Sequence, residues 1–486
     1  MNDAIRKKLT TSVFWSFAEQ LGRRGITVVV TVLLAHYVAP RDFGLISILV
    51  VVVALANVLM DAGIKEAIIR LREPSALDLD TAFYANMIFG VIACIIIITS
   101  ASYIAGFYEE PPLQTLIEVA SLSIIANAMQ AVPSAVLARK LEFRRQFKVN
   151  VLASLLAAIL TLVLAIKGAG AWALVCQMLA SAVLAAMIIW KMRIWRPTHR
   201  FSMHSFIHLF KFGYKISLSS FLEVVFTNMY VLVIAKVLMG TIVGLYFFAE
   251  KIRDVLVTQL VNSIQVVVYP VFSSLQDDPY RLRDGYRKVL VVSTFIVFPS
   301  MLLLSALADP LFESFLPQRW WTGGSYLQLL CIAGVFYPIH AMNLNVLKVK
   351  GRSDLYLYIE VIKKIIAIVI FAATINFGIY AILAGQIVWS MLTLIPNSFF
   401  SATLINYPAS AQINDVLPAF LVSVCVAAVT YVCVALFDWP DVLKLLVFGA
   451  SSLVAYISIA HILKLEGYNV AKDSLGRIFF DYSNDK

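Results

Sequence analysis

Long apolar stretches, separated by short charged or turn-rich breaks, recur along the whole chain. A helix needs about 20 mostly apolar residues to cross the hydrocarbon core of a bilayer. Stretches of this kind predict fourteen transmembrane helices, at 11–37, 42–63, 81–106, 113–136, 149–166, 170–190, 213–235, 243–272, 289–308, 324–347, 354–376, 378–402, 414–437 and 445–463. The expected fold class is therefore an all-α polytopic membrane protein.

Basic residues are unevenly distributed among the loops between these spans. The side that holds the N-terminus carries 28 of them. The opposite side carries Arg41, Lys167, Lys236, Arg319 and Lys444. Because cytoplasmic loops hold the excess of Lys and Arg, both termini are predicted to be cytoplasmic. The loop 403–413 has no basic residue, so the last two spans are the least constrained by this rule.

Composition agrees with the hydrophobic pattern. Residues of the AVILMFWYC set make up 61% of the 486 residues and charged residues 14%, whereas soluble proteins have about 45–50% and about 25%. This excludes a soluble globular protein. The formal net charge of +10 follows the loop asymmetry, so we expect membrane lipids and no nucleic acid as partners.

Motifs for catalysis and nucleotide binding are missing from the sequence. It contains no Walker or dinucleotide-binding glycine motif, and no set of nucleophile, base and orienting residue. The five cysteines lie in apolar stretches without CxxC spacing. We therefore expect no enzyme, no metal site and no ATP coupling within this chain.

Short matches recur between the two halves of the chain. An offset of 200 aligns Ala35, Gly44 and Leu45 with Ala235, Gly244 and Leu245, and the segment 170–174 matches 378–382. We interpret spans 1–6 and 7–12 as two copies of one six-helix unit in a parallel repeat, although chance similarity of apolar helices is the alternative. The predicted parts are an N-lobe at 1–200, a C-lobe at 201–405, and spans 13–14 with a C-terminal tail at 406–486.

Eleven charged residues fall inside predicted spans. Facing lipid, each costs roughly 3 kcal/mol at the centre of a helix, so we expect them to face protein or an aqueous cleft between the lobes. Spacings of three or four residues pair most of them on their own helix, as for Glu250 with Arg253, Lys251 with Asp254, and Glu360 with both Lys363 and Lys364.

Cations outnumber carboxylates among these residues, which predicts an anion site. Arginine and lysine suit phosphate oxygens, and unlike charges in the two halves predict a substrate with one strongly anionic end, such as a diphosphate. The candidate diphosphate-binding residues are Arg23, Arg24, Lys251, Arg253, Lys363 and Lys364. The candidates for binding a coupling ion, Na⁺ or H⁺, or alternatively for structural pairing, are Glu19, Glu223, Glu250, Asp254 and Glu360.

Three motifs carry a resemblance to a known family. They are the run 132–145, the run 244–252, and Tyr269-Pro-Val-Phe-Ser-Ser-Leu-Gln-Asp-Asp with the arginines that follow it. With them, residues 10–465 resemble bacterial polysaccharide transporters of the Wzx type. These belong to the MOP exporter superfamily, together with multidrug MATE transporters and the peptidoglycan lipid flippase.

The resemblance implies two six-helix lobes in a V shape plus two extra C-terminal helices, in a bacterial inner membrane. It implies a flippase that moves an undecaprenyl-diphosphate-linked oligosaccharide from the cytoplasmic to the periplasmic leaflet by alternating access. The product would serve lipopolysaccharide or exopolysaccharide assembly, with glycosyltransferases and a polymerase as partners. Arg23 and Arg24 resemble the cavity cations of such flippases.

Two alternatives stay open. An ion-coupled multidrug antiporter of the same superfamily is the first, but such exporters typically stop near twelve spans. A membrane glycan polymerase or transferase is the second, and the short loops on the predicted outer side argue against it.

Overall fold

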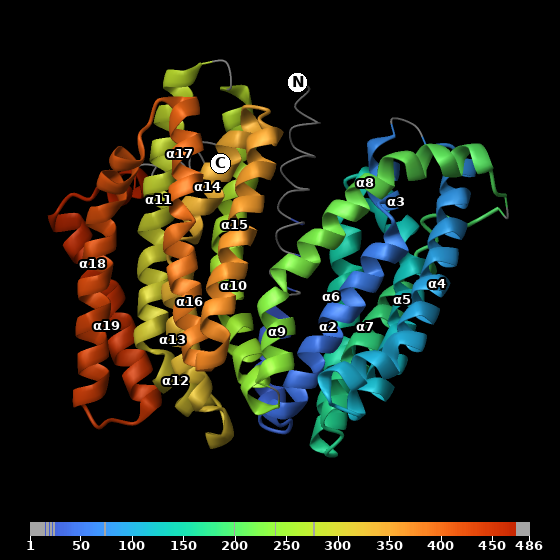
Figure 1. The fold of residues 1–486 in the computed structure, drawn as a ribbon, viewed down its shortest axis with the longest axis horizontal. Coiled ribbons are helices and arrows are strands. Elements are labelled where there is room, and N and C mark those ends of the chain that lie inside the picture. The colour runs from blue at the N-terminus through green and yellow to red at the C-terminus, as the bar shows by residue number, and fades with distance from the viewer. Residues whose placement is uncertain are drawn as a thin grey trace, which may run out of the picture. The chain divides into compact units, whose positions relative to one another are not determined.

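The computed structural model describes residues 15, 19, 22, 25–71, 74–198, 200–238, 240–275 and 278–472. The described residues form helices and turns, with no β-strand among them. They divide into two compact units, Met1–Phe247 and Phe248–Lys486 (Figure 1). This division is by compactness, and the lobe boundaries expected near residues 200 and 405 stay predictions.

The first unit is built from helices that run back and forth. A short apolar helix at Gly25–Ala35 precedes the others. They are α2 (Pro40–Asp61), α3 (Ile64–Arg70), α4 (Ala76–Tyr108), α5 (Pro112–Arg139), α6 (Phe143–Ile166), α7 (Ala171–Lys191), α8 (Met203–Thr227), α9 (Met229–Val237) and the start of α10 (Thr241–Ser274).

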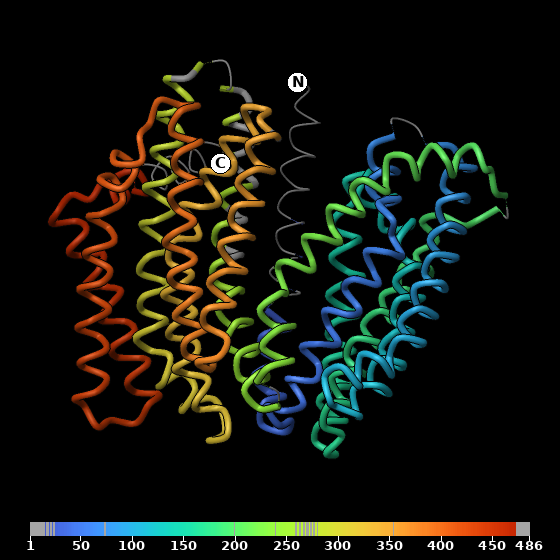
Figure 2. Tube along the Cα trace, viewed as in Figure 1, coloured from blue at the N-terminus to red at the C-terminus, as the bar shows by residue number. Residues whose placement is uncertain are grey.

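The second unit begins within α10, and several of the helices that follow are broken into two segments (Figure 2). They are α11 (Pro279–Ala306), α12 (Ala308–Phe315), η1 (Gln318–Trp320), α13 (Thr322–Gly334), α14 (Tyr337–Val349), α15 (Ser353–Thr374), η2 (Ile375–Phe377), α16 (Ile379–Leu392), α17 (Leu394–Ile405), α18 (Ala409–Leu436) and α19 (Asp441–Ile462).

Membrane-spanning helices account for most of the described chain. Ten helices are long and apolar enough to cross a bilayer, or eleven if α8 and α9, bent by 45°, form one span. The predicted spans 243–272 and 354–376 form α10 and α15, which carry internal charges and fall outside that count. The polytopic all-helical class is confirmed, whereas the number fourteen stays a prediction.

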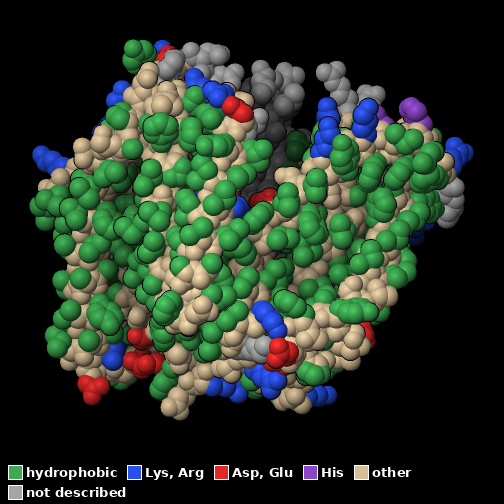
Figure 3. Space-filling view, in the orientation of Figure 1, with side chains coloured by type: hydrophobic (Ala, Val, Ile, Leu, Met, Phe, Trp, Pro, Cys, Tyr) green, Lys and Arg blue, Asp and Glu red, His purple; other side chains and the backbone are tan. Residues whose placement is uncertain are grey.

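Side-chain polarity follows the helix axes. On the face drawn in Figure 3, hydrophobic side chains cover the middle of each unit, and most Lys, Arg, Asp and Glu lie near the helix ends. In each unit we call one end the basic end: in the first unit it holds the α5–α6 turn, and in the second unit it holds the α14–α15 and α17–α18 turns. Solvation of charges outside the hydrocarbon core explains this distribution.

Two ion pairs close the opposite end of the first unit. Arg41 lies 2.8 Å from Glu110, and Lys236 lies 2.8 Å from Glu109. The hydrogen bond and charge of Lys236 lower the pKa of Glu109, so this pair contributes most at neutral pH and is lost as pH falls through that lowered pKa. Both pairs join the α4–α5 turn to other helices of the unit.

A glycine crossing brings α2 and the start of α10 into backbone contact. A Cβ atom added to Gly244 would lie 1.7 Å from the carbonyl oxygen of Pro40, and one added to Gly44 would lie 2.7 Å from that of Gly240. Small residues permit such close approach of membrane helices. Gly44 and Gly244 are the glycines that the offset of 200 aligns, so equivalent positions of the predicted repeat contact each other.

The glycine crossing predicts that position 244 does not tolerate a larger side chain. Gly244→Ala places a methyl group against backbone that cannot move without separating two helices, so we expect a loss of about 1–3 kcal/mol in stability or failure to fold. The thermal transition of the detergent-purified protein measures this loss. Gly106→Ala in α4 is the matched control, because no atom lies within 4 Å of its added Cβ. A Gly244→Ala variant as stable as the wild type would contradict the crossing.

Candidate functional site

The first group of predicted site residues lies on α10. Arg253 Nη2 lies 2.5 Å from Asp254 Oδ1 and 3.6 Å from Glu250 Oε1. The expected Glu250–Arg253 pair is therefore present, whereas Asp254, expected to pair with Lys251, contacts Arg253. The aliphatic stem of Arg253 reaches α13, where it lies 3.5 Å from a Cβ added to Gly334. Two cations and two carboxylates balance on this stretch of helix.

The second group lies on α15. Lys363 is buried, with 8% of its surface exposed, and its Nζ lies 2.7 Å from Glu360 Oε1. The backbone carbonyl of Lys363 accepts a hydrogen bond of 3.0 Å from Trp389 Nε1 on α16. Lys364 follows one position later and is partly exposed. Between residues 360 and 364 the helix thus carries two cations and one carboxylate, which leaves a positive excess.

The remaining predicted residues belong to the first unit. Arg23 and Arg24 lie outside the described residues. Glu19 is buried and accepts a hydrogen bond of 2.5 Å from Asn150 Nδ2 on α6. Glu223 is exposed on α8. The structure therefore brings together the charges on α10 and those on α15 as two local groups, and a cleft common to both lobes stays a prediction.

A buried histidine in the second unit was not predicted as a site residue. His340 on α14 is 6% exposed, and its Nε2 lies 3.0 Å from the carbonyl oxygen of Ser390 on α16. Its Nδ1 lies 2.6 Å from Asn397 Nδ2 on α17. A carbonyl oxygen accepts, so the contact with Ser390 places a proton on Nε2 of the ring. Three helices are thereby joined through one imidazole.

A second buried polar group continues toward the basic end. Tyr286 on α11 donates a hydrogen bond of 2.7 Å to Asn343 Oδ1 on α14. Ser401 on α17 donates to the same oxygen, and Asn343 Nδ2 donates to Ser398 at 3.4 Å. These residues are neutral, so a search of the sequence for charged residues inside spans does not identify them. Isolated Asn and His residues within apolar stretches were the available signal.

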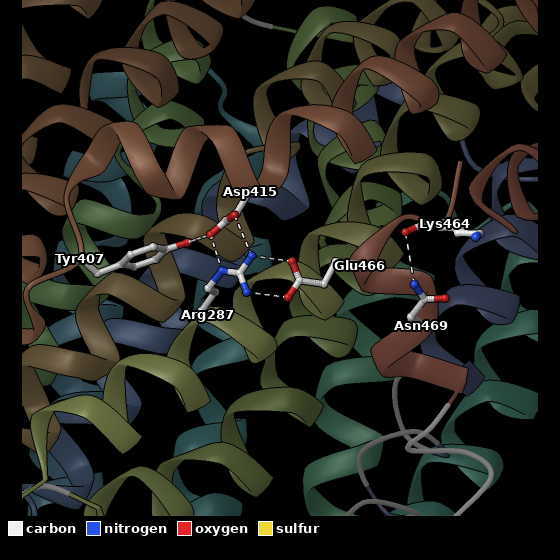
Figure 4. Close-up of polar contacts among 6 residues, drawn as sticks. All are labelled: Arg287, Tyr407, Asp415, Lys464, Glu466 and Asn469. Atoms are coloured by element: carbon white, nitrogen blue, oxygen red, sulfur yellow. Dashed lines mark hydrogen bonds and ion pairs between the residues drawn. The ribbon is translucent and has the colours of Figure 1, made fainter. Parts of the chain in front are cut away.

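An arginine at the basic end joins three parts of the second unit (Figure 4). Arg287 on α11 makes two hydrogen bonds to Asp415 on α18, at 2.6 and 2.9 Å. It makes two more to Glu466, just beyond α19, both at 2.6 Å. Tyr407 donates its hydroxyl to Asp415. Burial, and next this hydrogen bond, raise the pKa of Tyr407, so the hydroxyl stays protonated at neutral pH.

The Arg287 network predicts a stability effect. Arg287→Ala leaves two carboxylates without their common cation, and for partly exposed groups we expect a loss of about 1–2 kcal/mol. The thermal transition of the purified protein measures it. Lys288→Ala is the control, because it removes an exposed pair with Asp284 and should change stability by less than about 0.5 kcal/mol.

A double-mutant cycle gives the decisive comparison for this network. If Arg287 holds Glu466 directly, Arg287→Ala and Glu466→Gln are non-additive. Strictly additive losses would show that the two side chains act independently.

The fold defines a class, a polytopic helical membrane protein with an architecture similar to that of MOP superfamily transporters. The structure of “Lipid II flippase MurJ, inward closed conformation” is similar with a TM-score of 0.73 and 14% identity, over 93% of this chain and 98% of that chain. An inward-facing multidrug resistance MATE family transporter of the MOP superfamily has a TM-score of 0.59 and 15% identity, over 80% of this chain and 96% of the other.

The chain belongs to the polysaccharide biosynthesis protein family, whose family model matches residues 33–322. It is 27% identical to the lipopolysaccharide biosynthesis protein WzxC of Escherichia coli (strain K12) over 362 residues, 74% of each chain. It is 23% identical to the succinoglycan biosynthesis transport protein ExoT of Rhizobium meliloti (strain 1021), over 82% of this chain and 79% of the relative. The expected resemblance is confirmed at the level of the family, and the names of the relatives and structural neighbours, as transporters or flippases, agree with the expectation of a chain that is no enzyme.

Proposed function

We propose that the protein is a flippase for an undecaprenyl-diphosphate-linked oligosaccharide in surface polysaccharide assembly. Membership of the polysaccharide biosynthesis family carries this proposal, and relatives named for lipopolysaccharide biosynthesis and succinoglycan transport support it. The excess of basic residues in alternate loops supports cytoplasmic termini in a bacterial inner membrane. Fourteen spans in two lobes plus two helices remain part of the proposal, as do glycosyltransferase and polymerase partners.

The diphosphate would bind to intramembrane cations. Lys363 and Lys364 are the strongest described candidates, because their stretch of α15 carries a positive excess. Arg253 is weaker, since two carboxylates already occupy its guanidinium and a phosphate would have to displace one of them. Arg23, Arg24 and Lys251 complete the proposed set. Exchanging one anionic partner for another avoids leaving a buried charge alone.

Coupling to an ion follows from the Glu360–Lys363 pair. In this proposal a phosphate takes the place of Glu360 on the Lys363 ammonium, and the released carboxylate binds H⁺ or Na⁺. When the phosphate leaves, the ion pair forms again and the coupling ion is released. Glu360 is suited to this role because it is about one quarter exposed and its partner is buried. Glu19, Glu223, Glu250 and Asp254 are the other candidates.

Substitutions on α15 test the proposal. Lys363→Ala and Lys364→Ala each remove a charge-assisted hydrogen bond to phosphate, which corresponds to about a tenfold to hundredfold loss of transport. Surface polysaccharide in a deletion strain carrying each variant is the readout, normalised to protein in the membrane. Lys288→Ala is the control, because its ammonium pairs with Asp284 at the basic end. Normal export by both variants at normal protein level would overturn the site.

A multidrug antiporter is the second candidate, favoured only by the fold shared with MATE transporters. A drug-susceptibility panel on the deletion strain separates the two functions. Unchanged susceptibility together with loss of surface polysaccharide supports the flippase, and the reverse result supports the antiporter.

A further inference from the structure

A cavity of about 670 Å³ lies within the second unit, between α11, α14, α17 and α18. Its buried floor is mostly apolar, with Leu290, Ile339 and Val416, and also holds the buried polar residues Ser398 and Gln412. Its rim carries exposed apolar side chains, with Ile395 68%, Phe399 61% and Ile413 58% exposed. An apolar cavity with an exposed apolar rim, on helices long and apolar enough to cross a bilayer, is suited to contact with lipid hydrocarbon. We call it the lateral groove.

Polar residues mark one end of the lateral groove. Thr403 and Asn406, both exposed, line it where α17 ends and the chain turns toward α18. Pro408, also in the lining, follows Tyr407 in this turn. The groove thus runs from its apolar rim toward the basic end. An acyl chain takes a similar course, from the middle of a leaflet to the headgroup.

A cation outside the groove lining lies next to Tyr407, the residue before Pro408 of the lining. The guanidinium of Arg283 lies 5.5 Å from the centre of the Tyr407 ring. Arg283 precedes Leu290 of the groove floor by seven residues on α11, so both lie on nearly the same face, about 10 Å apart along the axis. The headgroup layer lies about 5–8 Å beyond the hydrocarbon core, so this separation suits a phosphate and its acyl chain.

Arg283 differs from the other cations near it on α11. Arg281 pairs with Asp278, Arg287 with two carboxylates, and Lys288 with Asp284. Within the part of the chain that the structure describes, no carboxylate oxygen lies within 4 Å of the Arg283 guanidinium, and its charge acts on Asp415 of α18 from a longer distance. An exposed guanidinium beside an apolar groove is complementary to a lipid that carries one phosphate charge.

We propose that the lateral groove binds an anionic phospholipid of the adjacent leaflet, with one acyl chain along the groove and the phosphate at Arg283. A single cation matches a single phosphate charge, whereas the diphosphate site proposed above has several cations. The inference concerns a resident lipid and stands apart from the proposed transport function. Its ligand class is phosphatidylglycerol or another phospholipid with net negative charge.

Binding of defined lipids to the purified full-length protein tests the proposal. The protein is delipidated in neutral detergent, and dioleoyl-phosphatidylglycerol or dioleoyl-phosphatidylcholine is added. Bound lipid is counted by native mass spectrometry. We expect tighter binding of phosphatidylglycerol, and for Arg283→Ala about a fivefold loss of that preference, because one basic residue contributes about 1 kcal/mol toward anionic lipid. Arg281→Ala is the matched control and should retain the preference.

A second variant addresses the groove itself. Ala402→Phe fills it from α17 and should lower the binding of both lipids alike, since the acyl chain loses its place while the cation remains. If this variant fails to fold, Phe399→Ala at the exposed rim replaces it, with a smaller loss of the same kind. Circular dichroism and gel filtration check that each variant is folded.

Three outcomes would overturn the proposal. Unchanged phosphatidylglycerol preference in Arg283→Ala would remove the phosphate contact. Unchanged lipid binding in both groove variants would place the lipid elsewhere. Displacement of bound phosphatidylglycerol by undecaprenyl phosphate at equal concentration would assign the groove to the polyprenyl chain instead. None of these results depends on transport, so the flippase proposal can fail while this one holds, and the reverse.

Discussion

Hydrocarbon offers no partner to a polar group, and this constraint organises the whole chain. Each unpaired charge at the centre of a membrane helix costs several kcal/mol, so charges either leave the core or find partners within it. The outer ends of the helices take most of them, as in the Arg41–Glu110 pair. Inside the second unit, the buried Lys363 pairs with Glu360, and the partly buried Arg253 contacts two carboxylates. His340 follows the same rule through Ser390 and Asn397.

The sequence predicted what depends on local spacing. Runs of apolar residues predicted the helices, because the length of a span is set by the bilayer. Spacings of three residues predicted Glu250 with Arg253 and Glu360 with Lys363, since such neighbours share a helix face. Spacing alone did not predict which of two possible acidic or basic neighbours a charged residue contacts. Asp254 contacts the adjacent Arg253 rather than Lys251, because a long guanidinium side chain can fold back along the helix.

Contacts across long sequence distances could not be predicted in this way. The Arg287 network joins residues more than 100 positions apart, and no spacing rule selects Asp415 and Glu466 from the other acids of the basic end. Glu19 similarly accepts a hydrogen bond from Asn150, which is 131 positions away in the sequence. The Gly44–Gly244 crossing is intermediate between contacts that local spacing predicts and contacts that the sequence does not predict. The offset of 200 aligned the two glycines, but only the helix packing shows that they meet.

The last two helices depend on α11. α18 packs chiefly against α11 and α19, and much less against α17, which precedes it in the chain. The lateral groove is lined by residues of α17 and α18, together with Leu290 of α11 and Ile339 of α14. An apolar cluster that includes Leu303, Val426 and Tyr456 holds this helix pair farther along α11, while Arg287 holds it at the basic end. Because the groove leaves α18 without protein on one side, whatever fills it completes the packing of this helix. Arg287 and the lateral groove therefore meet α18 at neighbouring residues, Asp415 and Val416, so both act on the same turn of this helix.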